Sequence, residues 1–295
     1  MQPALHRLGP FVVERRLAAG SMAEVFLARD PREGAAPRVA IKCLLPHWCR
    51  DRDHVRQFLA EAQLTSVLRH PNLVHGLGFG VASGRYYLAM RVAPGTALSN
   101  LMRQAGEQGS TVPSAVALAI VSTVAAAIAH AHETRGVIHR DLSPANILVD
   151  ATGAVTVIDF GVAHCAENAS GSARSDRALG TLAYAAPEVL EGRVADGRAD
   201  VFSLGVMLYE LLAGRRLFRR DSDASTLLAV TQAPVPPLHE HRPKLSRAIE
   251  QAMLSALERA RGCRTGSALE LARTLADLGA GDRQSIARWV ASLRL

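Results

Sequence analysis

The chain has 295 residues, of which 48% are hydrophobic and 21% are charged. This composition is typical of a globular protein with one large core or two adjoining ones, and it excludes a disordered chain. The formal net charge of +7 would suit a nucleic-acid-binding protein, but no aromatic-rich basic strand and no zinc-ligand spacing accompanies it. Only Lys42 and Lys244 are lysines, so an arginine-rich coding bias explains the charge better than a nucleic-acid partner.

The N-terminal sequence and the cysteines predict a cytoplasmic protein. No apolar block long enough for a signal peptide precedes Glu14. The four cysteines form neither a CxxC pair nor a crowded disulfide framework, so we expect reduced thiols at Cys43, Cys49, Cys165 and Cys263.

Residues 112–132 carry no Asp, Glu, Lys or Arg, so a membrane span has to be weighed against a buried helix. Ser122, Thr123, His130 and His132 lie in this Ala-rich stretch. They favour a buried helix, and no membrane span is expected.

The N-terminal third predicts a small strand-rich unit with one helix. Short β-like runs occupy 11–17, 24–29, 38–44 and 86–91. A helix is expected at 52–69, where Val55, Phe58, Leu59 and Ala62 recur at helical spacing and either Asp51 or Asp53 caps the first turn.

The remainder predicts a helical unit that begins after a short connection at 91–97. Helices are expected at 113–135, with Pro113 in the first turn, and at 200–212, 223–232, 245–258 and 267–278. Residues 201–212 are apolar on nearly every face, which predicts a central helix.

The C-terminal residues 281–295 are expected to form an amphipathic helix. Its apolar stripe consists of Ile286, Trp289, Val290 and Leu293. Such a stripe either packs on its own domain or contacts a partner or a membrane surface.

The most informative segment is HRDLSPANIL at 139–148, and Asp159-Phe160-Gly161 follows 18 positions after Asp141. With this order and spacing the chain resembles the bacterial eukaryotic-like (Hanks-type) Ser/Thr protein kinases over roughly residues 9–280. The resemblance implies an α+β, two-lobed kinase fold: an antiparallel-sheet N-lobe with one helix at about 9–92, a hinge at about 91–97, and a mainly helical C-lobe at about 98–280.

The resemblance also implies an ATP-dependent protein Ser/Thr kinase in bacterial signalling. Asp141 would accept or orient the proton of the substrate hydroxyl, while Asn146 and Asp159 would bind Mg²⁺, with Mn²⁺ as an alternative. His139 and Phe160 would hold the loops in register. The expected partners are proteins with Ser or Thr acceptors, and the sequence does not indicate an oligomeric state.

The segment VAIK at 39–42 resembles the strand whose lysine, here Lys42, grips the α- and β-phosphates and pairs with a helix glutamate, here Glu61. A lysine in such an apolar strand must find an anion. By the same resemblance, the residues around the nucleotide would be Leu17, Gly20, Val25, Ala40, Lys42, Met90, Val92, Asn146 and Asp159.

Three positions depart from the family pattern. The phosphate-covering loop keeps only Gly20, because Ala18 and Ala23 stand where the pattern has glycine. Alanine adopts a positive φ only at a cost of roughly 1 kcal/mol or more, so we expect a stiffer loop and weakened nucleotide binding. Ser143 replaces a lysine that touches the γ-phosphate, and Arg91 stands at a hinge position where glutamate is frequent.

Residues 180–188 (GTLAYAAPE) resemble the substrate-docking end of the activation segment, and Thr181 favours Ser/Thr acceptors. Glu188 is expected to pair with Arg264, and Asp200 to anchor the catalytic loop. We also expect autophosphorylation of the activation loop at Ser170, Ser172 or Ser175, which would order this loop by pairing with Arg140. A flexible polar loop without modification is the alternative.

Two other functions remain open at this point. The altered glycine loop and Ser143 would also suit a pseudokinase scaffold with weak or no turnover. A small-molecule phosphotransferase shares the lobe architecture, although the AlaProGlu segment, Thr181 and Arg264 favour peptide docking.

Overall fold

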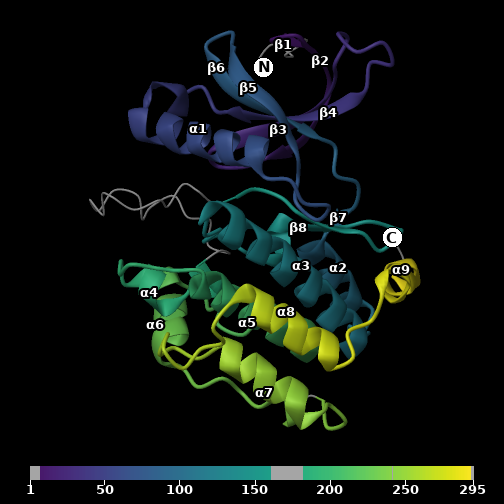
Figure 1. The fold of residues 1–295 in the computed structure, drawn as a ribbon, viewed down its shortest axis with the longest axis vertical. Coiled ribbons are helices and arrows are strands. Elements are labelled where there is room, and N and C mark those ends of the chain that lie inside the picture. The colour runs from purple at the N-terminus through teal and green to yellow at the C-terminus, as the bar shows by residue number, and fades with distance from the viewer. Residues whose placement is uncertain (1–6, 161–181, 241, 294–295) are drawn as a thin grey trace. The chain divides into compact units, whose positions relative to one another are not determined.

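The computed structural model describes residues 7–160, 182–240 and 242–293, which cluster into two compact units (Figure 1). Unit 1 holds the described residues up to Ala93 together with Asp159 and Phe160. Unit 2 holds Pro94–Ile158 and the described residues from Leu182 onward. The chain therefore passes from one unit to the other between Ala93 and Pro94, inside the segment expected as a hinge.

Unit 1 is built on a six-stranded antiparallel sheet with the strand order β1-β2-β3-β4-β6-β5. The strands are β1 (Arg7–Leu8), β2 (Phe11–Ala19), β3 (Ala23–Arg29), β4 (Arg38–Leu44), β5 (Gly76–Ala82) and β6 (Arg85–Arg91). Alternate residues of neighbouring strands share a face. One face carries the core cluster of Leu8, Phe11, Phe26, Ala28, Val39, Ile41, Cys43 and Ala89.

The helix of unit 1 is α1 (Arg52–Val67), which follows a single 3₁₀ turn, η1 (Trp48–Arg50). Asp51 is the N-cap, because its carboxylate accepts from the backbone N–H groups of Asp53 and His54. Phe58 and Ala62 are buried, as their spacing predicted.

Unit 2 is mainly helical. Its elements are β7 (Thr96–Ala97), α2 (Leu98–Glu107), α3 (Ser114–Arg135), η2 (Pro144–Asn146), β8 (Ile147–Val149), β9 (Val155–Val157), η4 (Leu182–Tyr184), α4 (Pro187–Leu190), α5 (Arg198–Ala213), α6 (Asp223–Gln232), η5 (Leu238–Glu240), α7 (Arg247–Ala256), α8 (Ala268–Asp277) and α9 (Arg283–Ser292). Pro113 is the N-cap of α3 rather than a member of its first turn. The antiparallel sheet with one helix in unit 1 and the mainly helical unit 2 match the α+β division that the sequence predicted.

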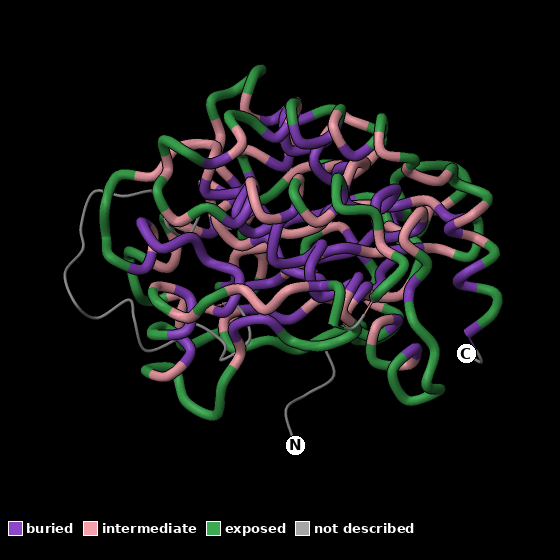
Figure 2. Tube along the Cα trace, turned by 90° about the horizontal axis from the view of Figure 1, so that it is seen from below, coloured by how far each residue is buried: buried purple, intermediate pink, exposed green. Residues whose placement is uncertain are grey.

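Helix α5 is the central helix of unit 2, as the apolar pattern predicted. Every residue from Ala199 to Leu212 is buried, and α5 packs against α3, α7 and α8. In Figure 2, buried residues lie toward the inside of the trace and the loops are mainly exposed.

Helix α3 is, among the described residues, the one helix long and apolar enough to cross a membrane by length and composition. In its most apolar window, 67% of the residues are buried inside the structure, and α3 packs against α5, α8 and α9. These contacts are those of a core helix, which agrees with the sequence-based preference for a buried helix.

The C-terminal helix α9 packs on its own unit. Ile286, Trp289, Val290 and Leu293 are all buried, and α9 contacts α3. The Arg283 guanidinium, in the first turn of α9, donates to the Thr152 carbonyl at 3.0 Å in the turn between β8 and β9. The apolar stripe is therefore covered within the chain.

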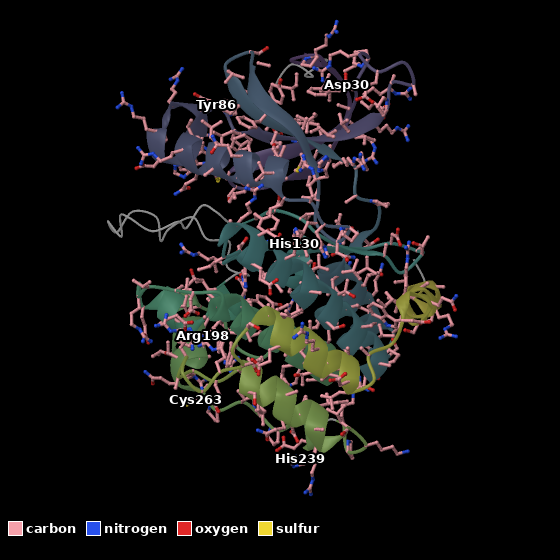
Figure 3. The ribbon with its side chains drawn as sticks, in the orientation of Figure 1. Asp30, Tyr86, His130, Arg198, His239 and Cys263 are labelled. Atoms are coloured by element: carbon pink, nitrogen blue, oxygen red, sulfur yellow. The ribbon has the colours of Figure 1, made fainter. Side chains whose placement is uncertain are left out.

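The sequence patterns missed β5 and α2. In β5 three alternate residues are glycine (Gly76, Gly78 and Gly80), which lowers β-propensity and hides the strand. The described cysteines Cys43, Cys49 and Cys263 are unpaired thiols, and Cys263, labelled in Figure 3, is exposed. Cys165 lies outside the described residues.

Candidate active site

Three charged groups meet in unit 1 at Lys42. The Lys42 Nζ donates to the Glu61 carboxylate at 2.6 Å and to the Asp159 carboxylate at 3.0 Å. Lys42 projects from β4, and Glu61 lies on α1. The lysine therefore has the anionic partner that its apolar strand predicted, and it has a second one in Asp159.

The electrostatics of this cluster keep Lys42 protonated. Burial alone would lower the pKa of Lys42, but the neighbouring carboxylates of Asp159 and Glu61 outweigh it and raise the pKa above its ordinary value. The ammonium group of Lys42 therefore stays charged between its two carboxylate partners, and the Asp159 carboxylate is 34% accessible.

Several of the other predicted nucleotide residues share one sheet face with Lys42. Val25 lies directly opposite Lys42, and Ala40 lies opposite Met90. Cross-strand partners point to the same side of a sheet, so these residues lie on the face opposite the core cluster. Leu17, 42% exposed, lies at a bulge in β2, and Val92, 38% exposed, follows β6.

The loop that is predicted to cover the phosphates has ordinary backbone geometry despite its two alanines. Ala18 pairs with Val25 at the end of β2, and Ala23 begins β3. Neither is among the described non-glycine residues with positive φ, so the expected strain at these alanines is not present. An added Cβ at Gly20 would meet only the Ala23 carbonyl, at 3.4 Å; this leaves room for a ligand to approach the backbone.

Arg91, at the predicted hinge position, uses its backbone N–H group within unit 1. Its N–H donates to the His75 carbonyl at 2.9 Å, so this donor serves unit 1 rather than a ligand.

The predicted catalytic loop, which lies in unit 2, is held by Asp200, as the sequence predicted. The Asp200 carboxylate, fully buried, accepts from the backbone N–H groups of His139 and Arg140, each at 2.8 Å. It also lies 2.7 Å from the His132 Nε2, a contact that sequence patterns did not reveal.

Asp141 and Asn146 are joined within this loop. The Asn146 Nδ2 donates to the Asp141 carboxylate at 3.0 Å and to the Asp141 carbonyl at 2.8 Å. Asn146 ends η2, whose N-cap Ser143 is buried. The Asn146 carbonyl accepts from the Ile158 N–H at 2.9 Å, which ties the loop to the residue immediately before Asp159.

Two of the predicted residues hold a left-handed backbone. Arg140 has φ +63° and Asp159 has φ +55°. Such a conformation costs free energy for a residue with a side chain and is concentrated at functional sites.

Each of the two predicted metal ligands offers donor atoms that a hard divalent ion prefers. Because both contacts of the Asn146 NH₂ group go to Asp141, the amide oxygen is the remaining group, and Asp159 supplies carboxylate oxygens. Amide and carboxylate oxygens are the ligands that Mg²⁺ and Mn²⁺ prefer. Within the part of the chain that the structure describes, no group of three His, Cys, Asp or Glu side chains could hold a metal ion, so the metal site at Asn146 and Asp159 stays a prediction.

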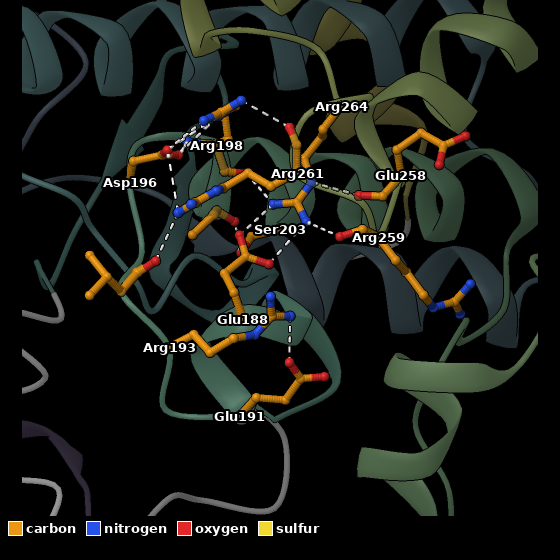
Figure 4. Close-up of polar contacts among 12 residues, drawn as sticks. Glu188, Glu191, Arg193, Asp196, Arg198, Ser203, Glu258, Arg259, Arg261 and Arg264 are labelled. Atoms are coloured by element: carbon orange, nitrogen blue, oxygen red, sulfur yellow. Dashed lines mark hydrogen bonds and ion pairs between the residues drawn. The ribbon is translucent and has the colours of Figure 1, made fainter.

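The AlaProGlu segment forms the expected ion pair, between Glu188 and Arg264, with the rest of unit 2. Glu188 and Arg264 form two contacts, of 2.7 and 3.0 Å, and both side chains are buried (Figure 4). Burial would raise the pKa of Glu188, but the hydrogen bonds from Arg264 outweigh it and lower that pKa. Arg264 also donates to the carbonyls of Glu258 and Arg198.

A second set of hydrogen bonds, which the sequence did not predict, connects this segment to α5. The Tyr184 hydroxyl donates to the buried Glu210 carboxylate at 2.6 Å, and the Ser203 hydroxyl donates to the Tyr184 carbonyl at 2.8 Å. Glu210 and Ser203 lie on α5, inside an apolar run. A charged residue at the centre of such a run is the signal that could have indicated this contact.

Gly161, Ser170, Ser172, Ser175 and Thr181 lie outside the described residues. The proposed phosphorylation sites and the acceptor-specificity residue therefore stay predictions.

Comparison with known proteins identifies the family. The profile described as "Protein kinase domain" matches residues 11–287. The chain is 39% identical to the tyrosine-protein kinase MasK of Myxococcus xanthus (strain DK1622), covering 86% of this chain and 41% of that protein. It is 34% identical to the serine/threonine-protein kinase PrkC of Bacillus subtilis (strain 168), covering 84% and 37%.

A comparison with solved structures gives the same family. The kinase domain of PknI from Mycobacterium tuberculosis matches with a TM-score of 0.71 and 28% identity, covering 92% of this chain and 97% of that one. The chain therefore belongs to the protein kinase family and resembles its bacterial Hanks-type Ser/Thr members. It spans less than half the length of MasK and PrkC.

Proposed function

We propose that the chain is an active protein kinase that transfers the γ-phosphoryl group of ATP to Ser or Thr hydroxyls of proteins. The observation that carries this proposal is the cluster at Lys42, whose ammonium group lies 2.6 Å from Glu61 and 3.0 Å from Asp159. A pseudokinase scaffold would not require this complete set of charges, and the family to which the chain belongs uses ATP and divalent metal ions.

In this proposal Lys42 holds the α- and β-phosphates, and Glu61 fixes the lysine. Val25, Ala40, Met90, Leu17 and Val92 surround the nucleotide, and Gly20 lets the loop backbone approach its phosphates. The shared sheet face of Val25, Ala40, Lys42 and Met90 supports this assignment.

Asp141 acts as the base that accepts or orients the proton of the acceptor hydroxyl. The Asn146 amide supports this role, because its hydrogen bond of 3.0 Å orients the Asp141 carboxylate. Asn146 and Asp159 are the proposed ligands of Mg²⁺ or Mn²⁺, which, when bound, would neutralise phosphate charge.

The acceptor residue needs its own test, because MasK is named a tyrosine-protein kinase and PrkC a serine/threonine-protein kinase. Pro144 in the catalytic loop supports Ser and Thr acceptors by resemblance. Transfer of labelled phosphate from ATP to a generic basic protein, followed by phosphoamino acid analysis, should yield phosphoserine or phosphothreonine. Phosphotyrosine as the main product would contradict the Ser/Thr assignment, and no transfer at all would favour the scaffold.

A further inference from the structure

The tip of the phosphate-covering loop is held from outside the loop. Within the loop, the Gly20 N–H donates to the Ala23 carbonyl at 2.9 Å. Two further bonds come from the segment after β4: the Leu45 N–H donates to the Met22 carbonyl at 2.9 Å, and the Trp48 indole N–H donates to the Ser21 carbonyl at 3.0 Å. Gly20 and Leu45 donate through their backbone N–H groups, whereas Trp48 donates through its side chain.

Trp48 is itself fixed by aromatic contacts. Its ring stacks on His54, with centroids 3.7 Å apart and an interplanar angle of 17°. His54 lies in the first turn of α1, where its backbone N–H donates to the N-cap Asp51 at 3.0 Å. The indole therefore connects the loop tip to the start of the helix that carries Glu61.

The anchor acts on the few residues of the loop that lie outside the strands. Strand β2 ends at Ala19 and β3 begins at Ala23, so Gly20, Ser21 and Met22 form the tip between them. A segment that is already held in one conformation loses less entropy when a ligand orders it. An anchored tip should therefore favour nucleotide binding.

We propose that Trp48 is a positioning residue that holds the tip of this loop ready for the phosphates of the nucleotide. The proposal rests on the proposed function, in which this loop covers ATP. Trp48 acts on ATP through the Ser21 carbonyl and is not itself a ligand of the phosphates.

Trp48→Phe is the sharpest variant, because phenylalanine keeps a ring to stack on His54 but has no N–H to donate. The loss of one hydrogen bond to the loop should raise the KM and Kd for ATP about 3- to 10-fold. The kcat should stay within about twofold of the wild type, because no group that touches the reacting atoms is changed.

The matched control is Trp289→Phe. Trp289 is buried on α9 in unit 2, and its indole nitrogen has no hydrogen-bond partner among the described residues. Its replacement should leave the KM for ATP unchanged, so a rise in KM confined to Trp48→Phe would be specific to the loop.

Tryptophan fluorescence provides a second readout, because the chain contains two tryptophans. In the Trp289→Phe protein, the remaining indole, Trp48, should change its emission as ATP is added and saturate at the Kd. Adenosine, which lacks phosphates, should leave the emission unchanged. The Trp48→Phe protein should not respond to ATP.

An unchanged Kd for ATP in Trp48→Phe would overturn the inference. A lower Tm and kcat with an unchanged KM would also overturn it, because that result describes a purely structural residue. If the wild type binds ATP but transfers no phosphate, the proposed function fails while the Kd comparison still decides the role of Trp48. If the wild type binds no ATP, both fail.

Discussion

At the scale of single residues, the buried charges among the described residues have specific partners. Lys42 has Glu61 and Asp159, and Asp200 holds two backbone N–H groups of the catalytic loop. A buried charge without a partner is expensive, so the removal of one partner should cost more than the loss of an exposed ion pair.

Glu188→Gln tests this at the ion pair with Arg264. Removing one charge from a buried pair costs about 3 kcal/mol or more, so the variant should be less stable to urea than the wild type at neutral pH. The matched control is Glu191→Gln, whose partner Arg193 and own side chain are exposed; an exposed pair contributes about 1 kcal/mol or less.

The pH dependence of this difference has a definite sign. The pKa of Glu188 is lowered in the folded protein, so its stabilisation is complete above the ordinary pKa of 4.5 and is lost as the pH falls through the lowered value. The difference in free energy of unfolding between wild type and Glu188→Gln should stay constant above pH 4.5. It should shrink as the pH falls from there through the lowered pKa of Glu188. A difference that widens in acid would contradict the assigned pair.

Residue contacts were predictable where a family motif or an obligatory charge partner indicated them. Lys42 with Glu61 and Glu188 with Arg264 belong to this class. The contact of Trp48 with Ser21 does not, because one indole on a single 3₁₀ turn has no periodicity and its acceptor is a backbone carbonyl.

At the scale of elements, the first turn of α9 contacts the turn between β8 and β9 in unit 2. The hairpin turn at 150–154 is closed by the Asp150 carboxylate, which accepts from the N–H groups of Thr152 and Ala154. Gly153 sits in this turn with φ +78°, and an added Cβ would lie 2.0 Å from the Arg283 carbonyl of α9.

Gly153→Ala should therefore displace α9 from the hairpin. We expect a loss of stability of about 2 kcal/mol or more, which combines the strain of positive φ with the backbone clash. Gly192→Ala is the matched control: Gly192 has φ +70° but no neighbour within 4 Å, so it should lose only about 1 kcal/mol. Equal losses in urea unfolding would mean that α9 does not press on Gly153.

Elements were predictable where the apolar pattern was strong. The patterns located α3, α5 and α6 to within two residues at each end, and all of α5 from Ala199 to Leu212 is buried. Strand β5 could not be predicted, because its alternate glycines conceal its pairing with β6. The short strand β7 could not be predicted either, because it is defined only by its pairing with β8.

At the scale of the whole molecule, the proposed catalytic residues belong to two units. Lys42, Glu61 and Asp159 belong to unit 1, whereas Asp141 and Asn146 belong to unit 2. Catalysis as proposed requires both sets to act on one nucleotide. The proposed metal ligands, Asn146 and Asp159, come one from each unit, so metal binding tests whether the two sets act together.

Mg²⁺ with ATP should stabilise the folded chain. A ligand that binds only the folded state adds about 2.7 kcal/mol at one hundred times its Kd, which corresponds to a rise in Tm of roughly 4 °C for a chain of this length. Chelation of the metal with EDTA should remove part of this shift. Asp159→Asn should lose the metal-dependent part while retaining a shift with ATP alone, and an equal metal effect in Asp159→Asn would contradict the role of Asp159.

The most direct test of catalysis by Asp141 is the intact mass of the protein after incubation with Mg-ATP and a generic basic protein. The wild type should add phosphoryl groups to itself or to the added protein, and Asp141→Asn should do so roughly 10²- to 10⁴-fold more slowly. Phosphate transfer at the same rate by both proteins, or by neither, would contradict it.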